Sequence, residues 1–200
     1  ARTPLEVVVG AILTQNTAWQ NVVKALAHLK KKKVLSVRAL GRVSSPRLAS
    51  LIRPAGYFNV KAGRLKNFVR FLNREYKGSL RRLFAERLPT LRERLLAVSG
   101  IGPETADSIA LYAAGKPVFV IDAYTKRIFS RYGWLKADCS YEAAQHFFTS
   151  RLPIKSRLFN EYHALIVQHA KKVCLKKPRC AECCLRRGCR YGRELAKNSF

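Results

Sequence analysis

Apolar side chains repeat at helical spacing along this chain, and this pattern constrains its fold more than any other feature. Residues 5–13 carry an apolar stripe with the period of one helical face, and the same period returns in later segments. The strand-like run at residues 118–121 is short enough to be a buried extended connector. The pattern predicts an all-α protein, with a first helix over residues 5–13 and others over residues 17–30, 45–54, 61–76, 80–87, 90–98, 103–114, 123–132, 141–151 and 156–173.

The charge balance indicates the class of partner. The 200 residues include 39 Lys and Arg against 12 Asp and Glu, which gives a formal net charge of +27. An apolar share of 48 % excludes a disordered basic tail. No uncharged apolar window is long enough to cross a membrane, and no secretory signal opens the chain, so we expect a cytoplasmic protein. Because such a charge needs a polyanion, nucleic acid is the first candidate partner, ahead of an acidic membrane surface.

Cysteine placement predicts a metal site. Five of the six cysteines lie within residues 174–189, whereas Cys139 stands alone. Clustered thiols in a chain without a secretory signal indicate a metal or iron–sulfur site and not a disulfide framework. The C-terminal loop has too few apolar residues to fold without its metal. Spacing alone hardly separates a four-cysteine zinc site from an iron–sulfur cluster.

Residues 95–110 predict two helices joined by a tight hairpin. One helix ends before Gly100-Ile101-Gly102, and Pro103 starts the next. Glycines permit a positive φ and let a backbone approach a ligand closely. The N–H groups and the dipole at the start of the second helix suit a phosphate oxygen. We therefore predict a hairpin that binds a phosphate of a nucleic acid; an ordinary tight corner between two helices is the alternative.

Aspartate is scarce, occurring only at positions 107, 122 and 138. Asp122 follows the apolar run at residues 118–121 and precedes a predicted helix. Its place favours a helix N-cap, which is a common role for aspartate. A carboxylate there could also stabilise positive charge on a bound substrate. The two roles are compatible.

Four motifs stand in an order that resembles one enzyme family: Thr3–Glu6 with Ile12–Thr17, Gly56–Ala62, Gly100–Ala106 with Val120–Asp122, and the cysteine cluster. Over almost the whole chain, the sequence resembles the helix–hairpin–helix DNA glycosylases of the endonuclease III superfamily. The resemblance implies a base-excision-repair enzyme that flips a damaged base out of double-stranded DNA and hydrolyses its N-glycosidic bond. A non-catalytic DNA-binding protein that uses the hairpin as a grip is the alternative of another class.

The same resemblance implies two closely packed helical subdomains. Residues 16–122 would form a helical barrel that contains the helix–hairpin–helix at about residues 90–114. Residues 1–15 and 123–200 would form the second subdomain, which ends in an iron–sulfur loop at residues 174–189. The chain contains no Met, so we expect that a native N-terminal segment is missing. We expect a monomer, associated with the nucleoid.

Site residues are implied by the matching positions. Asp122 would be the catalytic carboxylate, stabilising the developing oxocarbenium ion and orienting water. DNA contacts would come from Gln15, filling the gap left by the flipped base, and from Gly100, Ile101, Gly102 and Thr105. Four aromatic residues are candidates for the base pocket, although large aromatic residues are more often part of the core: Trp19, Tyr57, Phe58 and Trp134.

One position departs from the bifunctional members of the family. These carry a lysine that attacks the sugar, and the matching residue here is Glu104, which cannot form an imine. This favours a monofunctional enzyme, although Lys61 or Lys126 could still reach the sugar. The hairpin most resembles bacterial 3-methyladenine glycosylases, which implies alkylated purines as substrates. The alternative is an oxidised-pyrimidine glycosylase with lyase activity.

In the family, a [4Fe–4S] cluster occupies the cysteine loop. The resemblance implies Cys174, Cys180, Cys183 and Cys189 as its ligands. The first interval is one residue shorter than in the family, but the last two match and favour Cys183 over Cys184. A structural zinc ion is the alternative. His163 and His169 lie six residues apart, a poor spacing for a shared ligand face, so we expect them to be core or surface residues.

Overall fold

The computed structural model describes residues 3–197, which form helices joined by short connections and contain no β-strand. The predicted all-α fold and its helices are confirmed. Two helices were not predicted, Val37–Arg42 (α3) and Arg190–Lys197 (α12). In α3 only Leu40 of the six residues is buried, and no period can show in so short a segment. The helices are α1 (Pro4–Thr14), α2 (Trp19–Lys31), α3 (Val37–Arg42), α4 (Ser45–Leu51), η1 (Arg53–Ala55), α5 (Phe58–Tyr76), α6 (Leu80–Ala85), α7 (Leu88–Leu96), α8 (Pro103–Tyr112), α9 (Ala123–Tyr132), α10 (Tyr141–Thr149), α11 (Ser156–Lys172), η2 (Cys180–Glu182) and α12 (Arg190–Lys197).

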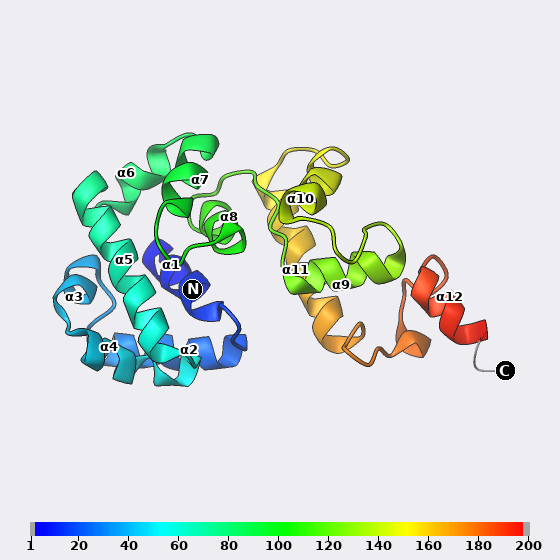
Figure 1. Cartoon of the computed structure of the whole chain (residues 1–200), viewed down its shortest axis with the longest axis horizontal. Helices are drawn as coiled ribbons and strands as arrows, with labels where there is room; N and C mark the ends of the chain where they lie inside the picture. Colours follow the sequence, from blue (N-terminus) through cyan, green and yellow to red (C-terminus); the bar gives the residue numbers. More distant parts are fainter. Residues whose placement is uncertain (1–2, 198–200) are drawn as a thin grey trace. The chain divides into compact units, whose positions relative to one another are not determined.

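The chain divides into two compact units, residues 1–116 and 117–200. In the first unit α1 packs against α2, α5 and α8, and α5 also packs against α3, α4 and α6 (Figure 1). In the apolar stripe of α1, Val8, Val9, Ile12 and Leu13 are fully buried, and full burial of one such side chain stabilises the fold by roughly 1.5–3 kcal/mol. These contacts group α1 with the first unit, which differs from the predicted grouping of residues 1–15 with residues 123–200.

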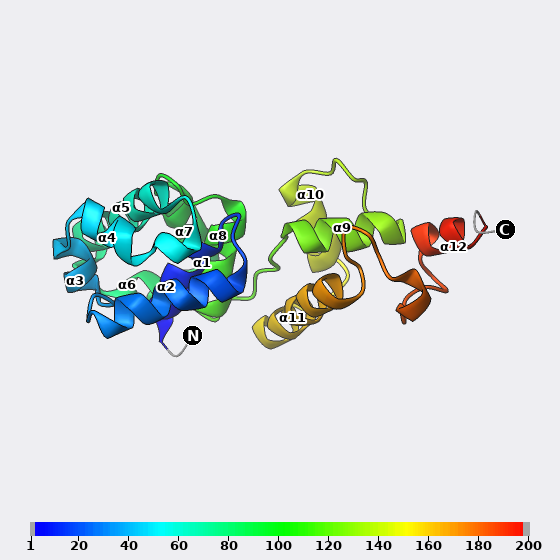
Figure 2. The ribbon, with the colours of Figure 1, turned by 90° about the horizontal axis from the view of Figure 1, so that it is seen from below.

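In the second unit α9 packs against α11 and α12, with α10 beside α9 in both ribbon views (Figures 1 and 2). Aromatic rings fill its core: Phe119 stacks on Phe148 with 4.2 Å between ring centroids, and Phe159 and Tyr162 meet Phe119 edge-on. The run at residues 118–121 is buried and extended without pairing into a sheet. It leads directly into Asp122, so the core fixes the start of α9.

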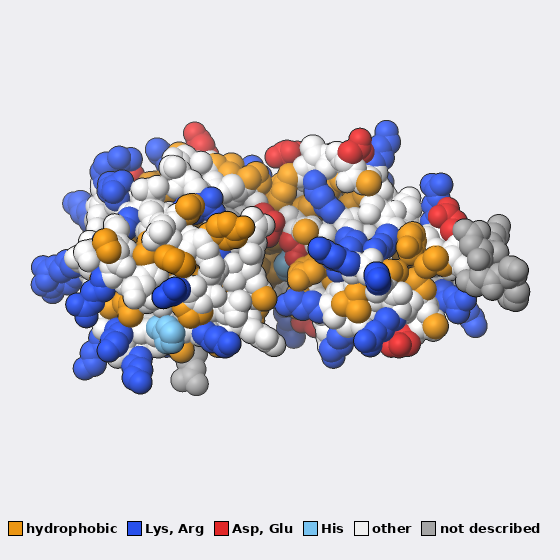
Figure 3. Space-filling view, turned by 60° about the horizontal axis from the view of Figure 1, so that its bottom comes forward, with side chains coloured by type: hydrophobic (Ala, Val, Ile, Leu, Met, Phe, Trp, Pro, Cys, Tyr) orange, Lys and Arg blue, Asp and Glu red, His pale blue; other side chains and the backbone are white. Residues whose placement is uncertain are grey.

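The surface of both units carries many Lys and Arg side chains (Figure 3). Within residues 3–197, no helix combines the length and the apolar character that a membrane span requires.

Candidate functional site

The predicted hairpin is present between α7 and α8. Gly100 has a φ of +93°, which favours glycine. Ile101 is buried, at 5 % exposure, and plugs the corner. Gly102 has an extended backbone and is the N-cap of α8, and nothing lies within 4 Å of where its Cβ would be. Gly102 therefore leaves open space beside the N-terminus of α8, where a phosphate oxygen could approach.

Gln15 is bound to this hairpin. Its Nε2 donates to the carbonyl oxygen of Gly100 at 3.0 Å and to Oγ1 of Thr105 at 2.9 Å. Its Oε1 accepts from Nη1 of Arg64. Asn16, the next residue, is exposed and has a left-handed backbone with a φ of +52°. The structure thus directs the Gln15 amide inward and leaves Asn16 at the surface of the α1–α2 loop.

Lys61 is buried, with 1 % of its surface exposed. Its Nζ donates to the carbonyl oxygens of Leu13 and Ala55 at 2.8 Å and to Oγ1 of Thr17 at 2.6 Å. Burial, together with the nearby charge of Arg64, lowers the pKa of Lys61 to about 8. All three donors of this ammonium are occupied inside the first unit, where they join the α1–α2 loop to η1.

Of the aromatic candidates, Tyr57 is the most exposed, at 71 %, and it adopts a left-handed backbone with a φ of +44°. Phe58 is half-buried beside Arg53. Trp19 lies against Gly10 of α1 and remains partly exposed. Because Thr17 binds Ala55, the loop before Trp19 is held next to the turn that carries Tyr57.

Trp134 is placed elsewhere. It follows the C-terminus of α9, whereas Asp122 caps the N-terminus of the same helix. A ten-residue helix spans about 15 Å. Trp134 instead packs on Tyr132 and Phe129 and is not brought together with Asp122.

Asp122 is the N-cap of α9, as predicted. Its Oδ1 accepts from the backbone N of Thr125 at 2.7 Å and from Oγ1 of Thr125 at 2.9 Å. Its side chain remains 12 % exposed, and its Oδ2 lies 3.5 Å from Nε2 of His163. Burial acts to raise the pKa of Asp122, but the hydrogen bond and charge of His163 and the two bonds from Thr125 outweigh it, so the pKa lies below its usual value. The carboxylate is therefore held ionised in a nearly dry place.

His163 of α11 is the site residue that the sequence did not reveal. The periodicity of α11 indicates only that position 163 is on the buried face of the helix. The contact with Asp122 joins residues about forty positions apart, so no local pattern shows it. The other two aspartates have different surroundings. Asp107 is buried and paired with Arg92 at 2.8 Å, and Asp138 is exposed.

Neither lysine considered as an alternative nucleophile is free. Lys61 is buried as described, and Nζ of Lys126 donates to the carbonyl oxygen of Cys139 at 2.7 Å. Glu104 is exposed in the first turn of α8. Position 104 thus carries an accessible carboxylate.

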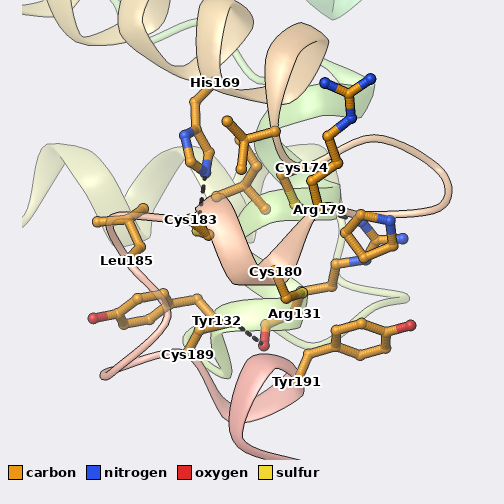
Figure 4. A pocket seen from close by; sticks show the side chains of 13 residues that line it. Arg131, Tyr132, His169, Cys174, Arg179, Cys180, Cys183, Leu185, Cys189 and Tyr191 are labelled. Carbon is orange, nitrogen blue, oxygen red and sulfur yellow. Dashed lines mark hydrogen bonds between the residues drawn. The ribbon is translucent and has the colours of Figure 1, made fainter. Parts of the chain in front are cut away.

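The four predicted cysteine ligands line one small cavity of about 30 Å³ together with His169 (Figure 4). The Sγ of Cys183 lies 3.6 Å from Nε2 of His169, and the Sγ of Cys189 lies 3.4 Å from the carbonyl oxygen of Arg131. Burial lowers the pKa of His169. Cys184 is exposed and lines a separate groove. The four thiols that share the cavity are Cys174, Cys180, Cys183 and Cys189.

The thiols in this cavity influence one another electrostatically. Burial raises the pKa of Cys180, and the neighbouring Cys189 and Cys174 raise it further. Burial likewise raises the pKa of Cys183. Four thiolates so close together need positive charge between them, which fits a metal centre. Within residues 3–197, however, no group of three His, Cys, Asp or Glu side chains is arranged to hold a single metal ion.

Comparisons with known proteins show the family of this chain. Residues 9–153 match the family described as the HhH-GPD superfamily base excision DNA repair protein. A protein of Methanocaldococcus jannaschii, provisionally named DNA repair glycosylase MJ1434, is 46 % identical over 191 residues, covering 94 % of this chain and 86 % of the relative.

Two solved structures share the fold. The H. pylori 3-methyladenine DNA glycosylase bound to 1,N6-ethenoadenine has a TM-score of 0.76 and 29 % identity, covering 84 % of each chain. An endonuclease III–DNA complex has a TM-score of 0.86 at 22 % identity, covering 98 % of this chain and 87 % of that one. The chain therefore belongs to the HhH-GPD superfamily of base excision DNA repair proteins and is a DNA N-glycosylase of that family.

Proposed function

We propose that this glycosylase is monofunctional, that it excises alkylated purines from double-stranded DNA, and that Asp122 is its catalytic carboxylate. The observation that carries the proposal is the set of contacts around the nearly buried Asp122 carboxylate: Thr125 donates to Oδ1 and His163 lies 3.5 Å from Oδ2. These contacts hold the pKa of Asp122 below its usual value. A fixed negative charge in a dry site stabilises positive charge on a sugar far better than it would in water.

In the proposed reaction the C1′–N bond breaks and its electron pair leaves with the base. Asp122 stabilises the oxocarbenium ion that develops on the sugar. A water oxygen then bonds to C1′, and the carboxylate accepts the proton that this water releases. The products are the free base and an abasic site. Duplex DNA with a damaged base is the substrate, and the protein acts as a monomer.

The absence of lyase activity rests on three side chains. A Schiff base requires an accessible amine. Glu104 has none, Lys61 is buried with its donors occupied, and Lys126 is bound to a backbone carbonyl. These placements support hydrolysis by water as the only route to the product.

Alkylated purines are the proposed substrate class because their cationic rings leave without prior protonation and stack well on aromatic faces. The hairpin resemblance and the likeness to the H. pylori 3-methyladenine glycosylase support this class. Trp19, Tyr57 and Phe58 remain the aromatic candidates in the first unit. Trp134 is left out of the proposed pocket, since it lies at the opposite end of α9 from Asp122.

The hairpin is proposed to hold one DNA phosphate through the N-terminus of α8. Asn16 and Tyr57 are exposed on turns that Lys61 and Thr17 join. An amide and an aromatic ring on adjacent rigid turns suit contact with bases that have been unstacked. We therefore assign the gap left by the flipped base to Asn16 instead of Gln15.

A [4Fe–4S] cluster is the proposed occupant of the cysteine cavity, held by Cys174, Cys180, Cys183 and Cys189. When bound, the cluster would tie the four cysteines of the basic C-terminal loop together, and its iron ions would balance the negative charge of the four thiolates. The paired test is Cys183→Ser against Cys184→Ser. The first should lose the brown absorption of the cluster and the second should keep it; a colourless wild-type protein that contains zinc would contradict the proposal.

The function is tested by single-turnover incubation with duplexes that carry alkylated purines, oxidised pyrimidines, uracil or an undamaged site. We expect release of the alkylated base and no covalent adduct after borohydride reduction. Release of oxidised pyrimidines with a trapped adduct would overturn both the substrate class and the monofunctional assignment. Tight binding without release of any base would show a DNA-binding protein instead.

A further inference from the structure

Two side chains from outside the hairpin bind its backbone, and a third side chain holds one of these two in place. Gln15 binds the Gly100 carbonyl and Thr105, Arg64 binds Gln15, and Nδ2 of Asn67 donates to the carbonyl oxygen of Ser99 at 3.2 Å. Gln15 ends α1, whereas Arg64 and Asn67 belong to α5. We call Gln15, Arg64 and Asn67 the hairpin clasp.

The partners of the Gln15 amide fix its orientation. Its NH₂ group faces two acceptors in the hairpin, and its oxygen faces the Arg64 guanidinium. A flipped amide would place oxygen against the Gly100 carbonyl and NH₂ against a cation, losing the bonds to Gly100 and Arg64. Arg64 therefore orients the amide that in turn holds the hairpin.

Arg64 also fits the hairpin by shape. A Cβ at Gly100 would collide with the Cγ of Arg64 and come within 2.9 Å of its Cδ. Gly100 is thus required twice, by its φ of +93° and by the Arg64 side chain that occupies the adjacent space. The contact leaves the hairpin little freedom to change shape while Arg64 stays in place.

The hydrogen bond to the Ser99 carbonyl determines the direction of the N–H group that follows it in the chain. No cis peptide bond occurs in the described chain, and in a trans peptide the C=O and the next N–H point in opposite directions. Asn67 draws the Ser99 carbonyl towards α5, which directs the Gly100 N–H away from α5. Gly102 is exposed and has open space beside it.

We propose that Gln15 and Arg64 are positioning residues that hold the hairpin in its phosphate-binding shape, so that the α1–α2 loop and the hairpin meet DNA as one rigid element. The inference rests on the proposed role of the hairpin as the phosphate grip. This role differs from one in which Gln15 fills the gap left by a flipped base. The Gln15 amide is hydrogen-bonded to the hairpin, whereas Asn16 is exposed.

The test uses Gln15→Met, which keeps the side-chain length and removes every hydrogen bond without changing the net charge. In the free protein, amide hydrogen exchange over residues 99–105 should become about tenfold faster, as loss of about 1.4 kcal/mol implies. The Kd for an undamaged duplex should weaken about five- to tenfold, with an unchanged slope against salt because no phosphate contact is removed.

Arg64→Met should speed the same amides, and the double variant should exchange no faster than the faster single variant, since the two residues act in one chain of bonds. Arg74→Met is the matched control, because it removes the same charge from α5 at an exposed position where Arg74 pairs with its neighbour Glu75. It should leave hairpin exchange at the wild-type rate.

The outcomes separate the inference from the function beneath it. If the hairpin amides of Gln15→Met exchange at the wild-type rate, the inference is overturned. If duplex affinity is also unchanged but excision is slower, Gln15 acts in base extrusion instead. Faster exchange with wild-type duplex affinity instead overturns the proposed grip of the hairpin on phosphate. The exchange measurement needs no catalysis, so an error in the role of Asp122 would not affect it.

Discussion

Lys61 and Asp122 are both largely buried ionisable groups, one in each unit, and their surroundings differ in kind. Lys61 faces neutral acceptors and has Arg64 nearby, so its environment disfavours the charge and lowers its pKa to about 8. Asp122 faces His163 and two donors from Thr125, so its environment favours the charge in spite of burial. Burial alone therefore does not mark a catalytic group: the partners decide whether a charge is tolerated for structure or kept ready for chemistry.

The comparison would break if Asp122 were only a helix cap. Asp122→Asn keeps a good N-cap but loses the negative charge, so we expect base release at least about a thousandfold slower with duplex Kd within about twofold. Single-turnover excision and duplex titration measure the two effects. Asp138→Asn, at an exposed position, is the control and should excise at the wild-type rate; an Asp122→Asn protein as fast as wild type would remove Asp122 from the mechanism.

Lys61→Met tests the structural side of the comparison. The change leaves the Leu13 carbonyl without its donor and should lower the free energy of unfolding by about 2 kcal/mol in urea titrations. Lys66→Met is the matched control on the same helix, since Lys66 binds the Gly41 carbonyl near the surface; it should cost less than about 1 kcal/mol. At a temperature where Lys61→Met is folded it should still excise bases, and loss of excision in a folded protein would make Lys61 more than structural.

The pH dependence of the same pair follows from linkage. The folded pKa of Lys61, about 8, lies below its ordinary value of 10.5, so between these pH values the unfolded chain binds more protons. Stability from this group therefore rises as pH increases from about 8 to 10.5. The difference in unfolding free energy between wild type and Lys61→Met should widen over that window, and a constant difference would contradict the lowered pKa.

His163→Asn should weaken the support of Asp122 without removing the carboxylate. Because His163 is the main partner that lowers the pKa of Asp122, its loss should raise that pKa and move the acid limb of the pH–rate profile to higher pH. We expect excision at neutral pH to fall about tenfold with unchanged duplex affinity. An acid limb at the wild-type pH would show that His163 is a packing residue only.

Thr125→Val is expected to have the smallest effect. It removes the Oγ1 donor but keeps the backbone N–H that also binds Oδ1 of Asp122. Excision should slow about three- to fivefold and the acid limb should move slightly in the same direction as in His163→Asn, since one neutral hydrogen bond contributes about 1 kcal/mol or less to the ionised form. A larger effect than that of His163→Asn would reverse the ranking of the two partners.

Local pattern accounts for much of the fold and for part of the site. Helical periodicity, the two glycines of the hairpin and an aspartate between an apolar run and a helix are all features of neighbouring residues, and the helices and the hairpin were predicted from them. The partners of Gln15, the burial of Lys61 and the approach of His163 to Asp122 join distant segments. Gln15, Lys61 and His163 are residue types that are common on protein surfaces, so the sequence alone does not indicate these contacts. They become visible only in the folded structure.

The clasp also bears on the order in which the molecule acquires its function. Gln15 and Gly100 are 85 residues apart in sequence, and closing a loop of that length costs about 4 kcal/mol of chain entropy. The hairpin is short and local, but the bonds that fix it appear only when α1 has docked against α5 and α8. A partly folded chain with this positive charge would still attract nucleic acid, yet it would lack a shaped grip until its first helix was in place.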